Sequence, residues 1–152
     1  MFTGSLRVRV NGILVQNEKM LLVHIQSPTK SDPFWMPPGG GVGFKETLEQ
    51  ALIREIQEET GLSVLPRSLL YVSEYLKDEW HAIEFYYLCE AVGGNMTLGT
   101  DPELDATNQM LKDIQWMGVE EISKIQLFPD FLRRDFKAIL SGNIPSLRFL
   151  SQ

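Results

Sequence analysis

Three glutamates crowd one short stretch of the chain. Glu55, Glu58 and Glu59 stand within the sequence REIQEETGL, residues 54–62. At about 100° per residue, a helix would gather their carboxylates on about a third of its circumference. Like charges four residues apart cost roughly 0.2–0.5 kcal/mol per pair in water, and more where solvent is excluded. We therefore expect a compensating positive charge beside them.

Spacing alone leaves two explanations open. The glutamates could belong to a solvated helix face, with Arg54 and Lys45 as loose counter-ions. They could instead hold a hard divalent cation, because Mg²⁺ and Mn²⁺ prefer oxygen ligands and clustered carboxylates supply them. The second explanation fits a phosphorylated ligand, since a metal ion can bridge carboxylates and phosphates.

The neighbouring residues predict the element that would position these side chains. Apolar residues recur at helical spacing from Leu48 to Ile56, which predicts a helix. Thr47 and Gln50 fit a capping box at its start, and Gly61 fits the glycine that often follows a helix. The glycines at 39–41 predict a tight turn whose backbone approaches a ligand closely.

Apolar and β-branched runs predict the rest of the fold. Strands are expected at 6–16 and 19–26, joined as a hairpin by Asn17 and Glu18, and at 69–78, 81–92 and 111–119. Loops are expected at 27–34 and 93–109, and helical segments at 120–125 and 128–140. This order lacks a regular βα alternation, so it predicts a single α/β (α+β) domain over residues 1–152.

As a whole, residues 40–62 resemble the Nudix box, G-x5-E-x7-R-E-U-x-E-E-x-G-U, in which U is a bulky aliphatic residue. The matching positions are Gly40, Glu46, Arg54, Glu55, Ile56, Glu58, Glu59, Gly61 and Leu62. Nine positions fixed in type and spacing make this signal specific. The chain therefore resembles a MutT-like Nudix hydrolase, which implies the Nudix fold, a mixed β-sheet sandwiched between α-helices.

The resemblance also implies a chemistry. In that family, the box binds Mg²⁺ or Mn²⁺ on the diphosphate of a nucleoside diphosphate linked to another group, and a metal-activated water cleaves the pyrophosphate bond. By motif position, Glu58 and Glu59 would be metal ligands, and Glu55 a further ligand or the general base. The carbonyl of Gly39 would be an extra ligand, and Arg54 would orient a box carboxylate.

Acidic residues beyond the box are further candidates for a metal ligand or the general base. Glu103, Asp105 and Asp113 are acidic residues in or next to the predicted 93–109 loop. Spacing does not choose among them. A solvated acidic surface is the alternative explanation for each.

Substrate identity is less constrained than the reaction. We expect a nucleoside triphosphate or an oxidised nucleotide; ADP-ribose, a nucleotide sugar, a dinucleotide or a non-catalytic nucleotide sensor are the alternatives. The LFPDF segment resembles the base-pocket segment of the branch acting on oxidised purine nucleotides, so Phe128 could stack on a base and Asp130 could bond its edge. Alternatively, Phe128 packs in the core and Asp130 caps a helix.

Two more residues are candidates for substrate binding. Trp35 could stack on a base or belong to the core. Arg7 and Arg9 share one face of a predicted strand and could reach phosphate, although a solvated face explains them equally well.

Composition narrows the partners. A net charge of −6 and a pI near 4.9 argue against long nucleic acid and leave a small-molecule nucleotide. Cys89, the single cysteine, excludes a disulfide framework and a Cys-based zinc site and predicts a buried, inert thiol. Met1–Val10 has no apolar signal segment and no run approaches about 18 apolar residues, so we expect a cytoplasmic protein without membrane contact. The family resemblance makes a homodimer possible.

Overall fold

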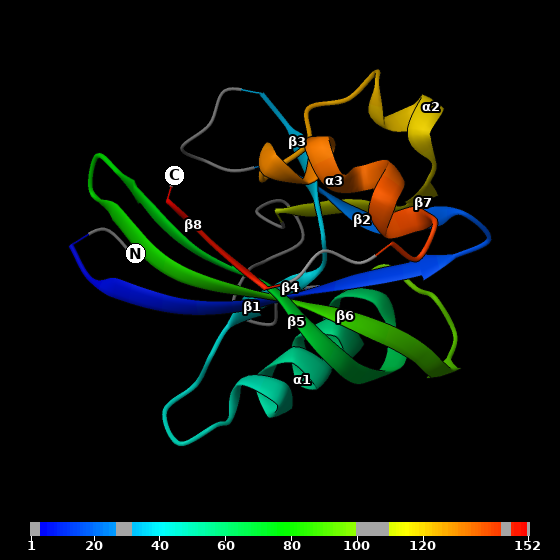
Figure 1. Ribbon diagram of the computed structural model, residues 1–152. Helices are drawn as coiled ribbons and strands as arrows, with labels where there is room; N and C mark the ends of the chain where they lie inside the picture. The colour runs from blue at the N-terminus through cyan, green and yellow to red at the C-terminus, as the bar shows by residue number, and fades with distance from the viewer. Residues whose placement is uncertain (1–3, 27–31, 100–109, 144–146, 152) are drawn as a thin grey trace.

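The computed structural model describes residues 4–26, 32–99, 110–143 and 147–151 (Figure 1). Its elements, in chain order, are β1 (Leu6–Gln16), β2 (Lys19–Ile25), β3 (Phe34–Met36), β4 (Gly39–Gly41), α1 (Leu48–Thr60), β5 (Leu62–Lys77), β6 (Trp80–Gly94), β7 (Leu111–Met117), α2 (Val119–Ile122), α3 (Phe131–Leu140) and β8 (Arg148–Ser151).

The strands form a mixed sheet with the order β3-β2-β1-β6-β5-β8, to which β4 adds beside β1 and β7 beside β2. Strand β1 runs parallel to β6 over nine paired positions and antiparallel to β2 and β4. The predicted β1–β2 hairpin is confirmed. Its turn residues Asn17 and Glu18 have φ values of 51° and 59°, which an asparagine tolerates better than most residues.

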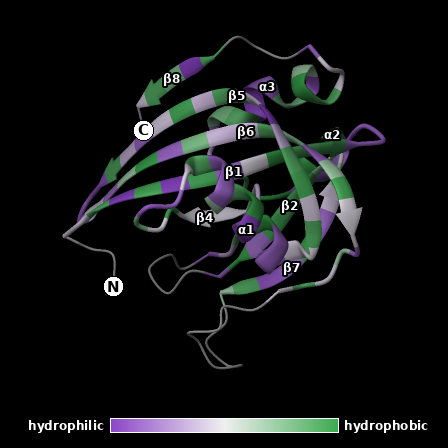
Figure 2. Ribbon diagram, turned by 90° about the horizontal axis from the view of Figure 1, so that it is seen from below, coloured by the Kyte–Doolittle hydropathy of each residue, from purple (hydrophilic) through white to green (hydrophobic). Residues whose placement is uncertain are grey.

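Helices cover both faces of this sheet, as predicted. Helix α1 packs on one face through Leu52 and Ile56, against β1 and β6. Helix α3 packs on the other face through Leu132 and Phe136, with Ile122 of α2 in the same apolar cluster. Figure 1 shows α1 below the sheet and α2 and α3 above it, and Figure 2 shows hydrophilic residues on the outer surface of α1. The α+β sandwich is therefore confirmed.

Several boundaries differ from the prediction. Strand β5 begins at Leu62 rather than at residue 69. The prediction missed its first part because Pro66 and the register shifts near it disturb the alternation of the side chains. The short strands β3 and β8 were not predicted. Glycines 39–41 form strand β4, paired with β1, where a tight turn was expected.

The predicted burial of Cys89 is confirmed. The thiol of Cys89 is buried, and burial raises its pKa to about 12, so it is inert at neutral pH. Within the described part of the chain, no helix has the length and apolarity needed to span a membrane.

Candidate active site

Helix α1 carries the three glutamates, and its ends are fixed by local hydrogen bonds. The Thr47 hydroxyl accepts a hydrogen bond from the Gln50 backbone N–H at 3.1 Å, and the Gln50 side chain accepts one from the Thr47 N–H at 2.9 Å. Gly61 ends the helix with φ 77° and donates its N–H to the Gln57 carbonyl. The predicted capping box and C-terminal glycine are both confirmed, and they set the phase of the carboxylates.

Arg54 is the centre of a network of carboxylates. It donates two hydrogen bonds to Glu46, at 2.7 and 2.9 Å, one to Glu55 at 2.9 Å and one to the Gly41 carbonyl at 3.1 Å. Its contact with Glu58 is longer, at 3.3 Å. The pKa of Arg54 is raised by these bonds, first by those to Glu46. One guanidinium therefore orients three box carboxylates.

Glu46 anchors this network rather than facing a ligand. Its carboxylate accepts the two Arg54 bonds and a third from the Gly43 N–H at 2.9 Å. Hydrogen bonding to Arg54, and then to Gly43, lowers the pKa of the Glu46 carboxyl to about 2. With its lone pairs occupied in this way, Glu46 holds the loop before α1 against the helix.

Strand β4 presents one of its edges to α1. The Gly39 N–H donates to Glu59 at 2.8 Å, and the Gly41 carbonyl accepts from Arg54. Between them, Gly40 has no room for a side chain, because a Cβ there would lie 2.3 Å from the Glu55 carboxyl carbon. The glycines thus let the helix carboxylates touch the strand backbone, and their close approach to a bound ligand stays a prediction.

Burial makes two of the carboxylates poor anions without a cation. Burial raises the pKa of Glu59 to about 8, although the Gly39 hydrogen bond opposes the shift. Burial also raises the pKa of Glu55, against the opposing effect of Arg54. Glu58 is more open, with 47% of its side-chain surface exposed. Carboxylates in this state gain from a bound cation or a proton.

The donor set fits a hard divalent ion. All three glutamates offer carboxylate oxygens on one helix face, and the edge of β4 adds backbone oxygens beside them. Among the described residues, no three acidic, histidine or cysteine side chains already converge into a complete metal site. Glu55 and Glu58 are held by Arg54 and Glu59 by Gly39, so they would turn toward an ion from these contacts.

Arg7 and Arg9 lie on β1, on the opposite side of β4 from Glu55. The Arg7 guanidinium lies 3.1 Å from where a Cβ on Gly41 would stand. Burial, followed by the charge of Arg9, lowers the pKa of Arg7 to about 10. Arg9 pairs with Glu84 of β6 at 3.6 Å, and its charge opposes the upward pKa shifts of Glu55 and Glu59. Positive charge therefore stands within reach of the carboxylate cluster.

The predicted base-pocket residues are separated. Phe128 packs edge-on against Phe34 and Tyr75, with ring centroids 5.9 and 5.7 Å away. Asp130 directly precedes α3, but its side chain is 97% exposed and makes no capping hydrogen bond. Trp35 stacks on His24 at 4.4 Å, and its backbone bonds residues 126 and 128. Phe128 and Trp35 thus belong to two different apolar clusters, and Asp130 points to solvent.

The acidic candidates beyond the box divide in two. Asp113 lies in β7 beside His24 and accepts hydrogen bonds from the Ile114 N–H at 2.8 Å and the Gln115 side chain at 2.9 Å. Glu103 and Asp105 lie outside the described residues. Their roles as ligand or base stay predictions.

Sequence reasoning missed Asn11 and Tyr86, two buried polar residues beside the box. Asn11 pairs with Gly39 of β4 on one side and Tyr86 of β6 on the other. The alternation Arg7, Arg9, Asn11 along one strand face was the available signal for Asn11. Tyr86 had none, because its position beside Asn11 depends on pairing between distant strands.

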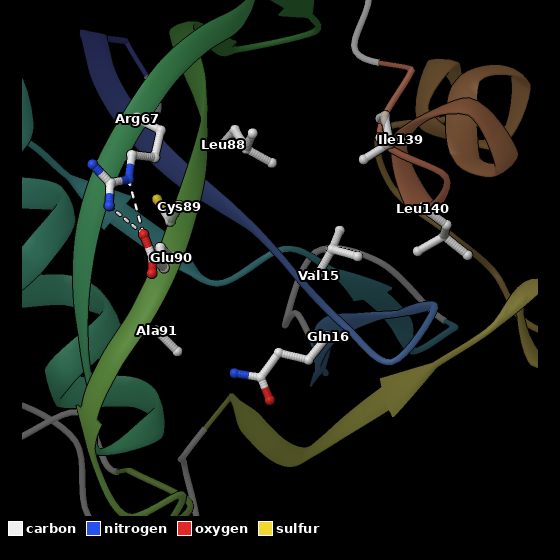
Figure 3. A pocket seen from close by; sticks show the side chains of 10 residues that line it. Val15, Gln16, Arg67, Leu88, Cys89, Glu90, Ala91, Ile139 and Leu140 are labelled. Atoms are coloured by element: carbon white, nitrogen blue, oxygen red, sulfur yellow. Dashed lines mark hydrogen bonds and ion pairs between the residues drawn. The ribbon is translucent and has the colours of Figure 1, made fainter.

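A separate pocket lies away from the box (Figure 3). It has a volume of about 520 Å³ and is lined mainly by Val15, Leu88, Ile139 and Leu140, with the Arg67–Glu90 ion pair at one side. Its lining residue Val15 is four residues along β1 from Asn11, about 13 Å at about 3.3 Å per residue. None of the residues predicted for the active site lines it.

Comparison with known proteins supports the resemblance to the Nudix box. A model of the NUDIX domain matches residues 5–138. The chain belongs to the Nudix family. Among solved structures, a NUDIX hydrolase from Nitrosomonas europaea superposes with a TM-score of 0.74 at 20% identity, over 96% of this chain and 78% of that one. This likeness supports the Nudix fold.

Two relatives that this Nudix chain resembles carry different enzyme names. An ADP-ribose pyrophosphatase from Methanocaldococcus jannaschii is 37% identical over 99 residues, covering 62% of this chain and 56% of the relative. An 8-oxo-dGTP diphosphatase from Proteus vulgaris is 41% identical over 68 residues, covering 43% of this chain and 61% of the relative. The matches thus span little more than half of each relative's length.

Proposed function

We propose that this Nudix chain hydrolyses the pyrophosphate bond of a nucleoside diphosphate linked to another group, with Mg²⁺ or Mn²⁺ as cofactor. The observation that carries the proposal is the pair Glu55 and Glu59, whose carboxyl pKa values are both raised at one edge of β4. Burial disfavours these anions, and a divalent cation would stabilise them. One relative named as a pyrophosphatase and one named as a diphosphatase support the same reaction class.

The box residues have separate tasks in this proposal. Glu55, Glu58 and Glu59 would hold the cation together with the Gly39 carbonyl. When bound, the cation would neutralise charge on the diphosphate and activate the attacking water. Glu55, fixed by Arg54 at 2.9 Å, either accepts the proton of that water or adds a ligand.

The first candidate substrate is a nucleoside triphosphate or an oxidised nucleotide. The relative from Proteus vulgaris supports it, and the half-buried rings of Phe128 and Trp35 each offer a surface on which a base could stack. Arg7, on the face of β4 opposite Glu55, would bind a phosphate.

The second candidate is ADP-ribose, a nucleotide sugar or a dinucleotide. The relative from Methanocaldococcus jannaschii supports it. One structural observation weighs against recognition of an oxidised base by Asp130, whose carboxylate is 97% exposed. Reading an oxidised base through Asp130 would need α3 to begin differently.

A substrate panel tests the proposal. Wild type would be incubated with canonical and oxidised nucleotides, nucleotide sugars, ADP-ribose and dinucleotide polyphosphates, with Mg²⁺ or Mn²⁺, and phosphate and pyrophosphate release measured. Glu58→Gln removes a proposed ligand, and Glu49→Gln in the first turn of α1 is the matched control. We expect turnover of one substrate class that falls about a hundredfold or more in Glu58→Gln only.

Other results would reject the proposal. Equal turnover in wild type and Glu58→Gln would separate the activity from the box. Absence of all turnover together with tight nucleotide binding would replace the enzyme with a nucleotide sensor.

A further inference from the structure

Several buried polar atoms without a hydrogen-bond partner gather in one place. Within the described parts of the chain they include Nδ2 and Oδ1 of Asn11, the hydroxyl of Tyr86 and Nε of Arg9. Asn11 and Tyr86 are both fully buried. An unsatisfied buried polar group is costly, so native proteins keep few of them, and a cluster calls for an explanation.

The cluster lies directly beside the proposed metal site. Asn11 is the strand partner of Gly39, whose N–H binds Glu59, and of Tyr86 on β6. A Cβ on Gly39 would stand 2.6 Å from Oδ1 of Asn11, so the amide fills the space above β4 that a side chain there would need. Glu59 meets β4 at its outer edge, and Asn11 lies one strand inward, about 5 Å away.

All members face the α3 side of the sheet. Arg9, Asn11 and Ile13 are every second residue of β1, so their side chains share one face. Ile13 packs in the cluster that contains Phe136 of α3. The Tyr86 ring lies 5.6 Å from the Phe131 ring at the start of α3. A group that reaches Asn11 would therefore come over the inner face of β4, from the side of Arg7 and Arg9.

We propose that Asn11, Tyr86 and Arg9 form a polar subsite for the part of the substrate beyond the diphosphate. The proposal rests on the proposed hydrolase function and names how the same site recognises its substrate. An amide and a phenol offer donors and acceptors without net charge, and the charge of Arg9 is balanced by Glu84 at 3.6 Å. The matching ligand group is neutral with a donor beside an acceptor, such as a base edge or a sugar diol.

Arg9 is the member of this subsite that solvent reaches. Its side chain is 22% exposed, whereas Asn11 is fully buried. Its contact with Glu84 exceeds hydrogen-bond length at Nε, so the guanidinium can turn toward a phosphate. In the proposal, that movement would open a path to the Asn11 amide for the group attached to the phosphate.

Adjacent tyrosines supply a matched test. Tyr71 and Tyr86 are strand partners with ring centroids 6.3 Å apart, but the Tyr71 hydroxyl donates to Asp135 at 2.6 Å. Tyr86→Phe removes an unpartnered hydroxyl, so we expect the Tm to hold or rise. Tyr71→Phe removes a partnered one, so we expect the Tm to fall by about 2 to 4 °C. Asn11→Leu, of similar size, should behave as Tyr86→Phe.

Binding is measured without turnover, so failure of the hydrolase proposal stays distinguishable. Nucleoside 5′-monophosphates, ribose 5-phosphate and inorganic phosphate would be titrated by calorimetry in EDTA and again with Ca²⁺. We expect Tyr86→Phe and Asn11→Leu to bind the monophosphates about tenfold more weakly than wild type. Tyr71→Phe and Glu49→Gln should match wild type. An equal loss with ribose 5-phosphate assigns the contact to the sugar, and a loss with nucleotides alone assigns it to the base.

Three results overturn the proposal. One is wild-type affinity in both Tyr86→Phe and Asn11→Leu, which would leave the cluster as buried structure only. Another is an equal loss of affinity in Tyr71→Phe, which would show a general packing effect. The third is wild type binding the monophosphates no better than inorganic phosphate. If Asn11→Leu does not fold, Tyr86→Phe decides alone.

Discussion

Metal binding at Glu59 should release a proton at neutral pH. Burial raises the pKa of this carboxyl to about 8 in the metal-free protein, while its hydrogen bond from the Gly39 N–H persists at 2.8 Å. At pH 7 about nine-tenths of the molecules would therefore carry the proton. A cation binds the carboxylate and must displace it.

The expected size follows from the shift. Moving the pKa from 4.5 to about 8 corresponds to about 5 kcal/mol, at 1.36 kcal/mol per pH unit. Below pH 8, the affinity for Mn²⁺ should fall about tenfold for each pH unit, and about 0.9 proton should leave Glu59 per ion at pH 7. The raised pKa of Glu55 adds to this slope.

Stability of the metal-free protein should change with the opposite sign. The folded state keeps the Glu59 proton up to about pH 8, whereas the unfolded chain loses it near pH 4.5. The folded state binds more protons in this window. The contribution of Glu59 to the free energy of unfolding therefore decreases as pH rises from 4.5 to 8. Saturating Mn²⁺ should remove this dependence.

Calorimetric titration of Mn²⁺ in two buffers of different ionisation enthalpy measures the proton release, and urea unfolding in EDTA at pH 6 and pH 8 measures the stability. Glu59→Gln should release about 0.9 fewer protons per bound ion than wild type at pH 7. Glu49→Gln, in the first turn of the same helix, should release as many protons as wild type. An affinity for Mn²⁺ that stays constant from pH 6 to 8, with no proton exchanged, would refute the reasoning.

Three further predictions concern the support of the carboxylates. Gly40→Ala should lower kcat about a hundredfold, because the new Cβ would lie 2.3 Å from the Glu55 carboxyl carbon and displace it; unchanged steady-state kinetics would contradict this. Arg54→Lys should weaken Mn²⁺ affinity or kcat by about 10- to 100-fold, since a lysine cannot reproduce the two-point contact with Glu46. Gly61→Ala should lower the free energy of unfolding in urea by about 1 to 3 kcal/mol, because φ is 77° there; wild-type stability would rule out the strain.

Helix α1 could be predicted from sequence because the information is local. Its phase follows from the spacing of Leu48, Leu52 and Ile56, and both caps act within four residues of the chain. The positions of the box carboxylates follow from the helix. The motif also supplied the role of Arg54, whose hydrogen bonds to Glu46 span only eight residues.

Strand β4 could not be predicted, because its structure depends on a distant partner. Three consecutive glycines have low strand propensity, and the expected turn was the natural interpretation. Pairing of Gly39 with Asn11 and of Gly41 with Arg9 makes them a strand. The same limit applies to Asn11 and Tyr86, since whether a polar atom has a partner depends on strands far apart in sequence.

Strand β4 also links the two halves of the proposed site. Gly39 donates to Glu59 at one edge of the strand and lies against the Asn11 amide on its inner face. A ligand group that binds Asn11 therefore presses on the residue whose carbonyl is proposed to hold the cation. Because the three glycines have no side chains that would hold their backbone in place, it should move when such a group binds. Substrate recognition and metal geometry should therefore be coupled. In that case, Asn11→Leu would change the Mn²⁺ dependence of turnover as well as the affinity for the nucleotide.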